Sequence, residues 1–273
     1  MRHMRALQAT TLHSETLQLR RSSVALQLEV PRRFNPLKDL VIFILPGLAA
    51  PGELYAQDRH YLAQRTGSAV ATLTWGRELD LHYLRHPRRE HSRQAIAAAE
   101  RVDELFGVPT RKIIVGHSNG GGDAAVKAAH ALASKKAGEI VGVDLEAAVG
   151  VDGPLLLRAN EMLGATREVL GASLGWKGAD MATTSARYCA RNLPLIAAES
   201  LAAVTVDIRP ELAFLKGKNV VVERNVYDGD SVVPTHREAQ DLFRHDGNHF
   251  SVLDPDVIYA NVEHLIGRLP AAA

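Results

Sequence analysis

The segment from Lys112 to Gly122 constrains the fold of this chain more than any other stretch. It joins β-branched residues, which favour a central strand, to a G-x-S-x-G motif, and an alanine-rich segment that predicts a helix follows at Asp123–Ala133. The backbone must reverse between strand and helix, so Ser118 is expected in a sparsely populated conformation with its hydroxyl facing a cleft. A Cβ at Gly116 or Gly120 would press on the neighbouring strand or helix. The motif therefore predicts Ser118 as a nucleophile.

Two backbone N–H groups near Ser118 are candidates for stabilising a developing negative charge. The helix after Ser118 would point its positive end and its free N–H groups at the reacting atoms, which makes the N–H of Asn119 one candidate. The second should come from a loop facing the serine. The Pro46-Gly47-Leu48 turn supplies it, because Gly47 permits close approach and the N–H of Leu48 can point inward. The alternative is that this turn only ends a strand.

Apolar segments of strand type alternate with segments of helical periodicity along the chain. This alternation predicts an α/β fold with a mostly parallel sheet covered by helices on both faces. Leu17–Leu19 and Val24–Val30 are expected to form an antiparallel pair at the N-terminus. The further predicted strands are Val41–Leu45, Ala69–Trp75, a strand within Ile140–Val151, and Val220–Val226; the predicted helices are Tyr55–Arg65, Ser92–Phe106 and Asp256–Arg268, with Asp254-Pro255 starting the last.

The region from Pro154 to Leu215 interrupts the alternation, with several helical stretches, scattered glycines and no convincing strand. We predict a helical cap over residues 154–215, inserted into a core formed by residues 1–153 and 216–273. The alternative is that these helices pack elsewhere on the sheet. A chain of 273 residues that is 46% hydrophobic can bury the core of one such domain with an insertion.

A serine nucleophile needs a base to take its proton and an acid to orient that base. His249 is the preferred base, since it lies in a loop directly before the closing helix, and His245 is the reserve. Asp230, which follows the valine-rich predicted strand, is the preferred acid. Asp228 and Asp152 remain alternatives, although the Asp228-Gly229 pair is also a common turn former.

With Ser118, Asp230 and His249 in this order, the chain resembles the α/β-hydrolase superfamily from Val41 to Leu269, and is most similar to its capped esterase, lipase and C–C hydrolase branches. The resemblance implies a sheet of about eight strands, a cap after the sixth strand, and acyl transfer through a serine-bound intermediate. It assigns Ser118 as nucleophile, His249 as base, Asp230 as acid, and Leu48 and Asn119 as oxyanion donors. Asp230 and His249 are only 19 positions apart, which predicts a truncated or absent last strand.

The expected activity is hydrolysis of a small-molecule carboxylic ester without a cofactor. A thioesterase and a C–C bond hydrolase are the rival enzymes, and a non-catalytic binding protein with this fold is the rival outside them. The arginines near residues 77–93 form a basic patch that is either a solvated surface or a contact for an anionic substrate such as an acyl thioester. The sequence leaves the oligomeric state open.

Composition excludes several other classes. Lysine plus arginine (32) balances aspartate plus glutamate (31), which argues against nucleic acid or an anionic membrane as partner. No apolar run reaches the ~20 residues of a membrane span, and no segment has signal-peptide character, so a cytoplasmic protein is expected. Cys189 is the single cysteine and is expected to be a small buried residue. His82 and His86 lack the partners of a metal site, and no metal is expected.

Overall fold

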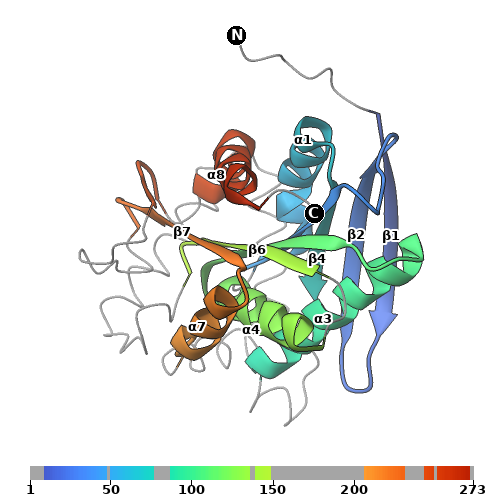
Figure 1. The fold of residues 1–273 in the computed structure, drawn as a ribbon, viewed down its shortest axis with the longest axis horizontal. Helices are drawn as coiled ribbons and strands as arrows, with labels where there is room; N and C mark the ends of the chain where they lie inside the picture. The colour runs from blue at the N-terminus through green and yellow to red at the C-terminus, as the bar shows by residue number, and fades with distance from the viewer. Residues whose placement is uncertain are drawn as a thin grey trace.

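The computed structural model describes residues 9–47, 50–76, 87–135, 139–148, 206–230, 243–248 and 251–270. These residues form an eight-stranded sheet in the order β1-β2-β4-β3-β5-β6-β7-β8, which crosses the centre of the molecule (Figure 1). The strands are β1 (Thr10–Gln18), β2 (Ser23–Pro31), β3 (Leu40–Leu45), β4 (Ala69–Trp75), β5 (Arg111–His117), β6 (Glu139–Glu146), β7 (Val221–Tyr227) and β8 (Phe243–His245).

The pairing of the strands confirms the predicted fold class. β1 pairs with β2 and β2 with β4 in antiparallel fashion, and every pair from β4 to β8 is parallel. The predicted N-terminal antiparallel pair is present, although β1 begins at Thr10, well before the expected Leu17. Because β3 and β5 to β8 run the same way, their carboxyl ends meet at one edge of the sheet, which is where parallel α/β sheets place their sites.

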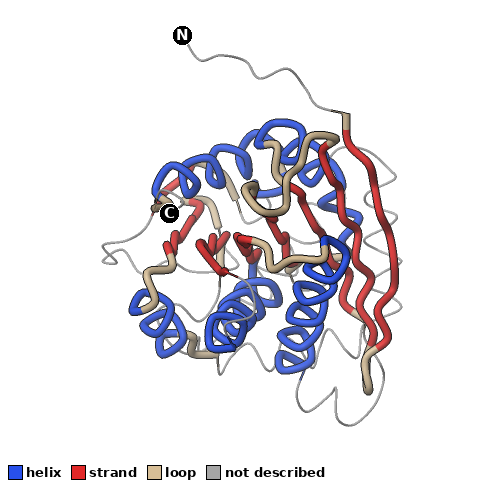
Figure 2. The backbone as a smooth tube through the Cα atoms, turned by 45° about the vertical axis from the view of Figure 1, so that its right-hand side comes forward, coloured by secondary structure: helices blue, strands red, loops and turns tan. Residues whose placement is uncertain are grey.

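Helices cover both faces of the sheet, as Figures 1 and 2 show. On one face α1 (Ala56–Thr66) packs against α8 (Pro255–Arg268), with the short 3₁₀ helices η1 (Gly52–Tyr55) and η2 (Ser251–Leu253) beside them. On the other face lie α3 (Pro87–Phe106), α4 (Ser118–Lys135) and α7 (Arg209–Gly217), with α4 between the other two. No helix in these ranges is long and apolar enough to cross a membrane.

Alternate side chains of the central strands enter two separate apolar cores. On β3, Val41, Phe43 and Leu45 belong to the core beneath α3 and α4, and Ile42 and Ile44 belong to the core beneath α1 and α8. All five are at most 1% exposed. A strand buried on both faces reads as a continuous apolar run, which is why this strand was evident in the sequence.

Two helices begin earlier than the sequence predicted, whereas a third begins where expected. α3 starts at Pro87 rather than Ser92, because proline suits the first turn of a helix. α4 starts at Ser118 rather than Asp123 and so includes glycines 120–122 despite their low helix propensity. The Asp254 carboxylate accepts the Asp256 N–H at 3.0 Å and caps α8, as its sequence predicted.

The predicted cap falls largely outside the described residues, which resume at Val206. The part that is described packs on the core, since α7 contacts α4 and β7 and buries Leu212 and Leu215. The cap over residues 154–215 thus stays a prediction. Cys189, His82 and His86 also lie outside the described ranges.

The last strand is present but truncated, which resolves the open expectation. β8 contains only Phe243–His245 and pairs with the end of β7. Because this strand is so short, Asp230 and His249 can be only 19 positions apart.

Candidate active site

Ser118 lies at the junction of β5 and α4, where β5 ends at His117 and the helix begins at the serine itself. Its φ angle is +60°, in the left-handed region that a residue with a side chain rarely adopts. Such a conformation costs about 1–3 kcal/mol and persists only where the surrounding structure imposes it. Ser118 is 5% exposed. The bend between strand and helix that the sequence predicted is therefore present, and Ser118 occupies it.

The turn after β3 packs directly on this bend. A Cβ added to Gly47 would lie 2.9 Å from the Cβ of Ser118 and 3.3 Å from the His117 carbonyl oxygen. Only glycine allows this approach, as the sequence suggested. Leu48 lies outside the described residues, so its N–H remains a predicted oxyanion donor. Asn119 is the second residue of α4, where helical N–H groups have no acceptor within the helix.

Buried side chains that the sequence did not single out hold this turn. The indole Nε1 of Trp75 donates to the Pro46 carbonyl oxygen at 3.1 Å. The Gly47 N–H donates to the hydroxyl oxygen of Tyr55 at 3.3 Å. That oxygen also lies 2.6 Å from Nδ1 of His117, the residue before Ser118. We define the Ser118 elbow as Gly47, Tyr55, His117 and Ser118.

The loops that carry the predicted acid and base are joined through their backbones. The Gly229 N–H donates to the Gly247 carbonyl oxygen at 2.8 Å, one residue before Asp230 and two before His249. A Cβ on Gly229 would lie 2.5 Å from the same oxygen, so the contact requires glycine. His249 itself lies outside the described residues. The structure thus brings the two loops together at the carboxyl ends of β7 and β8.

The alternative residues for acid and base have other partners. The carboxylate of Asp228 is 56% exposed and lies 3.2 Å from Arg244. The imidazole Nε2 of His245 lies 2.7 Å from the Asn225 side-chain oxygen, at the end of β8. Asp230 is partly buried, and its N–H closes a turn onto the Tyr227 carbonyl oxygen at 2.9 Å. Asp152 lies outside the described residues.

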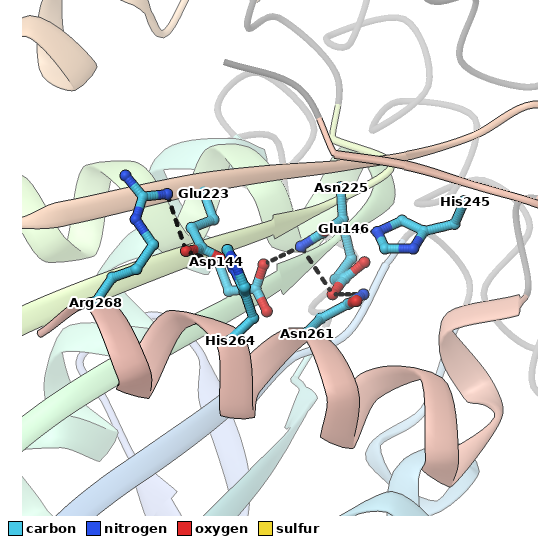
Figure 3. Close-up of polar contacts among 8 residues, drawn as sticks. All are labelled: Asp144, Glu146, Glu223, Asn225, His245, Asn261, His264 and Arg268. Carbon is cyan, nitrogen blue, oxygen red and sulfur yellow. Dashed lines mark hydrogen bonds and ion pairs between the residues drawn. The ribbon is translucent and has the colours of Figure 1, made fainter.

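A set of buried carboxyl groups lies beneath these loops, between the sheet and α8 (Figure 3). We call Asp144, Glu146 and Glu223 the buried acid network; each is at most 1% exposed. Asp144 and Glu146 are on β6, and Glu223 is opposite Asp144 on β7. Three carboxyl groups without water would repel one another strongly if all were charged. Their neighbours determine which of them keeps its proton.

The Glu146 carboxylate accepts hydrogen bonds from three side chains. Its Oε2 accepts the Tyr227 hydroxyl at 2.7 Å, and its Oε1 accepts the side-chain amides of Asn261 at 2.8 Å and Asn225 at 3.4 Å. Burial raises the pKa of Glu146, whereas these donors lower it in part.

Asp144 and Glu223 differ sharply in their surroundings. Glu223 lies 3.0 Å from the Arg268 guanidinium and 3.1 Å from Nδ1 of His264, both on α8. Asp144 accepts the Asn225 amide at 2.7 Å. Burial, and then the charges of Glu146 and Glu223, raise the pKa of Asp144 well above its usual range. The charged form of Asp144 is therefore disfavoured in the folded protein.

The arginine patch is only partly within the described ranges. The guanidinium of Arg88 lies 3.5 Å from the Asp123 carboxylate, and that of Arg93 lies 3.0 Å from Glu90. These acids offset the positive charge of both arginines. The pairing with two buried carboxylates favours a local ion-pair network over an anion-binding surface for this part of the patch.

No family model matches the chain, and no curated protein matches it. Solved structures do match it over nearly its full length. An esterase from the archaeon Pyrobaculum calidifontis superposes with a TM-score of 0.54 at 14% identity, over 93% of this chain and 80% of the esterase. A bromoperoxidase from Bacillus anthracis has a TM-score of 0.59 at 12% identity, over 93% of this chain and 99% of its own. A thioesterase domain from the curacin biosynthetic pathway has a TM-score of 0.55 at 14% identity, over 92% and 98%.

The chain has the α/β-hydrolase fold. The strand order, the antiparallel start and the serine at the bend after β5 carry this identification together with the superpositions. At identities of 12–14% the superpositions establish the fold alone. The activity of an α/β-hydrolase-fold protein must be argued from its own site.

Proposed function

We propose that the protein is a serine hydrolase that cleaves a small-molecule carboxylic ester through an acyl-enzyme intermediate. The observation that carries the proposal is the conformation of Ser118, at φ +60° between β5 and α4 with Gly47 packed on its Cβ. A serine held this way costs stability, and such strain concentrates at functional sites. A serine that only ended a strand would gain nothing from the strain.

In the proposed mechanism the Ser118 oxygen attacks the ester carbonyl carbon while His249 takes the hydroxyl proton. The N–H groups of Asn119 and Leu48 donate to the resulting oxyanion. When the intermediate collapses, the alcohol leaves with the proton from His249. Water, activated by His249, then attacks the acyl-enzyme and releases the acid. Asp230 orients the imidazole and stabilises its charged form.

The contact between Gly229 and Gly247 supports the assignment of acid and base, because it joins the loops that lead to Asp230 and His249. The 56% exposure of the Asp228 carboxylate disfavours it as the acid, which is expected to be buried beside the base.

The solved structures support acyl chemistry without selecting a substrate. One structural neighbour is an esterase and another a thioesterase domain, yet a third is a bromoperoxidase. A thioesterase and a C–C bond hydrolase use the same nucleophile and remain the rival enzymes. A binding protein that has retained the fold without turnover is the non-catalytic rival.

A fluorophosphonate probe separates enzyme from binding protein. We expect the wild-type protein to be labelled covalently and Ser118→Ala to remain unlabelled. The matched control is Ser14→Ala, which removes an exposed hydroxyl from the edge strand β1 and should leave labelling unchanged. Folded wild-type protein that resists the probe would favour the binding protein.

A substrate panel then distinguishes the enzymes. p-Nitrophenyl esters of increasing chain length, acyl-CoA thioesters and vinylogous diketones report ester, thioester and C–C cleavage respectively. The ester proposal expects the highest kcat/KM on a carboxylic ester. A clear preference for acyl-CoA or for a diketone would replace it with the corresponding rival.

A further inference from the structure

The hydrogen bonds of the Pro46–Gly47 turn determine which of its N–H groups can face a substrate. The Gly47 N–H already donates to the Tyr55 hydroxyl oxygen at 3.3 Å. An N–H has one proton to donate, so Gly47 is not an oxyanion donor while this bond is made. The next N–H along the turn belongs to Leu48. The bond to Tyr55 therefore points to Leu48 as the donor from this turn.

Tyr55 also contacts the other side of the site. Its hydroxyl oxygen is 2.6 Å from Nδ1 of His117, the residue that immediately precedes Ser118. A tyrosine hydroxyl can accept the Gly47 N–H and donate its own proton to Nδ1 at the same time. One hydroxyl thus links the turn after β3 to the bend after β5.

The link is protected from water. Tyr55 is 0% exposed and His117 is 3% exposed. Burial raises the pKa of Tyr55, so its hydroxyl keeps the proton that it donates. In a buried site water does not readily replace a lost protein partner, so a polar group left unpaired there is destabilising.

We propose that Tyr55 is a positioning residue, whose hydroxyl sets the distance between the Pro46–Gly47 turn and the Ser118 bend. The hydroxyl oxygen also accepts the Gly47 N–H, which leaves the next N–H, that of Leu48, to donate to the oxyanion. The inference rests on the proposed function. Tyr55 does not touch the substrate; it acts through Gly47 and His117. The Trp75 indole, which donates to the Pro46 carbonyl oxygen at 3.1 Å, holds the same turn from its other end.

The test is Tyr55→Phe, which removes only the hydroxyl. We expect kcat on the preferred ester to fall about 10- to 100-fold with KM nearly unchanged, because misplacing an oxyanion donor weakens the transition state selectively. Affinity for a trifluoromethyl ketone, which forms a tetrahedral adduct with the serine, should fall by a similar factor. A residue needed only for folding would lower the amount of active protein, but kcat per active molecule and the affinity for the ketone would not change.

Tyr61→Phe is the matched control, because it removes a hydroxyl that bonds Asp256 at 2.5 Å on the surface between α1 and α8. It should keep wild-type kcat and ketone affinity. If Tyr55→Phe does not fold, Trp75→Phe decides, since it frees the Pro46 carbonyl and should also lower kcat at constant KM. Wild-type kcat in folded Tyr55→Phe, or in Trp75→Phe as the substitute, would overturn the inference.

The two proposals fail in different ways. If fluorophosphonate labels the wild-type protein and Tyr55→Phe at equal rates, the positioning role is wrong and the serine hydrolase stands. If the folded wild-type protein is not labelled at all, the proposed function fails, and the positioning role fails with it. Slower labelling of Tyr55→Phe than of Tyr61→Phe supports both.

Discussion

The Ser118 elbow and the buried acid network both place polar groups inside the sheet region, but they do so at different costs. In the elbow the cost is conformational, since Ser118 adopts a φ of +60° and Gly47 packs on its Cβ. In the network the cost is electrostatic, since Asp144 and Glu146 are removed from water together. The first region depends on the positions of atoms and the second on the position of a proton.

This difference predicts which measurement each region should affect. Changes in the elbow should lower turnover at every pH, and any effect on the free energy of unfolding should depend little on pH. Changes in the network should alter the free energy of unfolding and its dependence on pH, with little effect on turnover. Both quantities should therefore be measured for every variant below.

The largest effect is expected at Asp230, the preferred catalytic acid. Its loop leaves β7 after Tyr227, a donor to the network, and leads toward the predicted base. If Asp230 orients His249, Asp230→Asn should lower kcat about 10⁴-fold, because an amide favours the wrong imidazole tautomer. Steady-state kinetics on the preferred ester measure this effect.

Asp228→Asn is the control, two residues earlier on the same loop. It breaks an exposed ion pair with Arg244 that contributes at most about 1 kcal/mol, so kcat should change little. The reverse ranking, with Asp228→Asn the more damaging, would transfer the role of acid to Asp228. A small effect of both would direct attention to Asp152.

The second effect tests the elbow alone. In Gly47→Ala the new Cβ would lie 2.9 Å from that of Ser118, so the turn or the serine must move. We expect kcat/KM to fall about 100-fold, the size of effect that misplacing a reacting group by about 1 Å produces. Near-wild-type kcat/KM would show that the turn does not define the site.

Gly267→Ala is the matched control for this substitution. Gly267 lies in α8, and its added Cβ meets nothing within 4 Å. Alanine in a helix is favoured over glycine by about 0.5–1 kcal/mol, so this variant should be slightly more stable and equally active. Thermal unfolding and kinetics together separate the two glycines.

The elbow was predictable from the sequence because its signal is local. Strand, G-x-S-x-G motif and helix follow one another within a single segment, and the structure places Ser118 at the bend. The helix boundary was the part that failed, since α4 begins at Ser118 although propensity suggested Asp123. Tyr55 was missed because its partners Gly47 and His117 lie 8 and 62 positions away.

The network was not predictable from one sequence, because it is assembled from β6, β7 and α8. The only trace is the alternation along β6, where Val143 and Leu145 enter the apolar core beneath α4 while Asp144 and Glu146 face α8. Alternation of this kind usually indicates a strand with one face in water. Here α8 covers the polar face, which no local pattern records.

The third effect tests the network through its proton. Asp144→Asn replaces a carboxyl group by an amide of the same shape, and the bond from Asn225 can be kept. We expect the free energy of unfolding at pH 8 to rise by at least about 1 kcal/mol, because the amide is neutral without retaining a proton that the unfolded chain would release at this pH. Turnover should stay within a few-fold of the wild type.

The direction of the pH dependence follows from the raised pKa of Asp144. The folded protein keeps a proton that the unfolded chain releases above about pH 4. Asp144 thus contributes full stability below that pH and less as the pH rises through its folded pKa. The groups that face it are Glu146, Glu223 and Asn225 from the sheet, with Asn261, His264 and Arg268 on α8.

Urea unfolding at pH 4, 6 and 8 tests this linkage. The wild type should lose stability with rising pH relative to Asp144→Asn, and the two should converge near pH 4. Some slope should persist in the variant, because burial also raises the pKa of Glu146. Parallel curves for the two proteins would show that Asp144 does not hold the proton.

The smallest effect is expected at the outer end of the network, where the solvent-exposed guanidinium of Arg268 compensates the charge of Glu223. The Arg268 guanidinium, 49% exposed, lies 3.0 Å from the buried Glu223 carboxylate, which also keeps His264. Arg268→Gln should therefore cost no more than about 1 kcal/mol, and turnover should be unchanged. Salt screens exposed charges, so the difference from the wild type should shrink between 0.1 M and ~1 M salt. A loss of several kcal/mol that salt does not reduce would mean that Glu223 and Arg268 behave as a buried ion pair. Removing Arg268 would then leave the charge of the Glu223 carboxylate uncompensated.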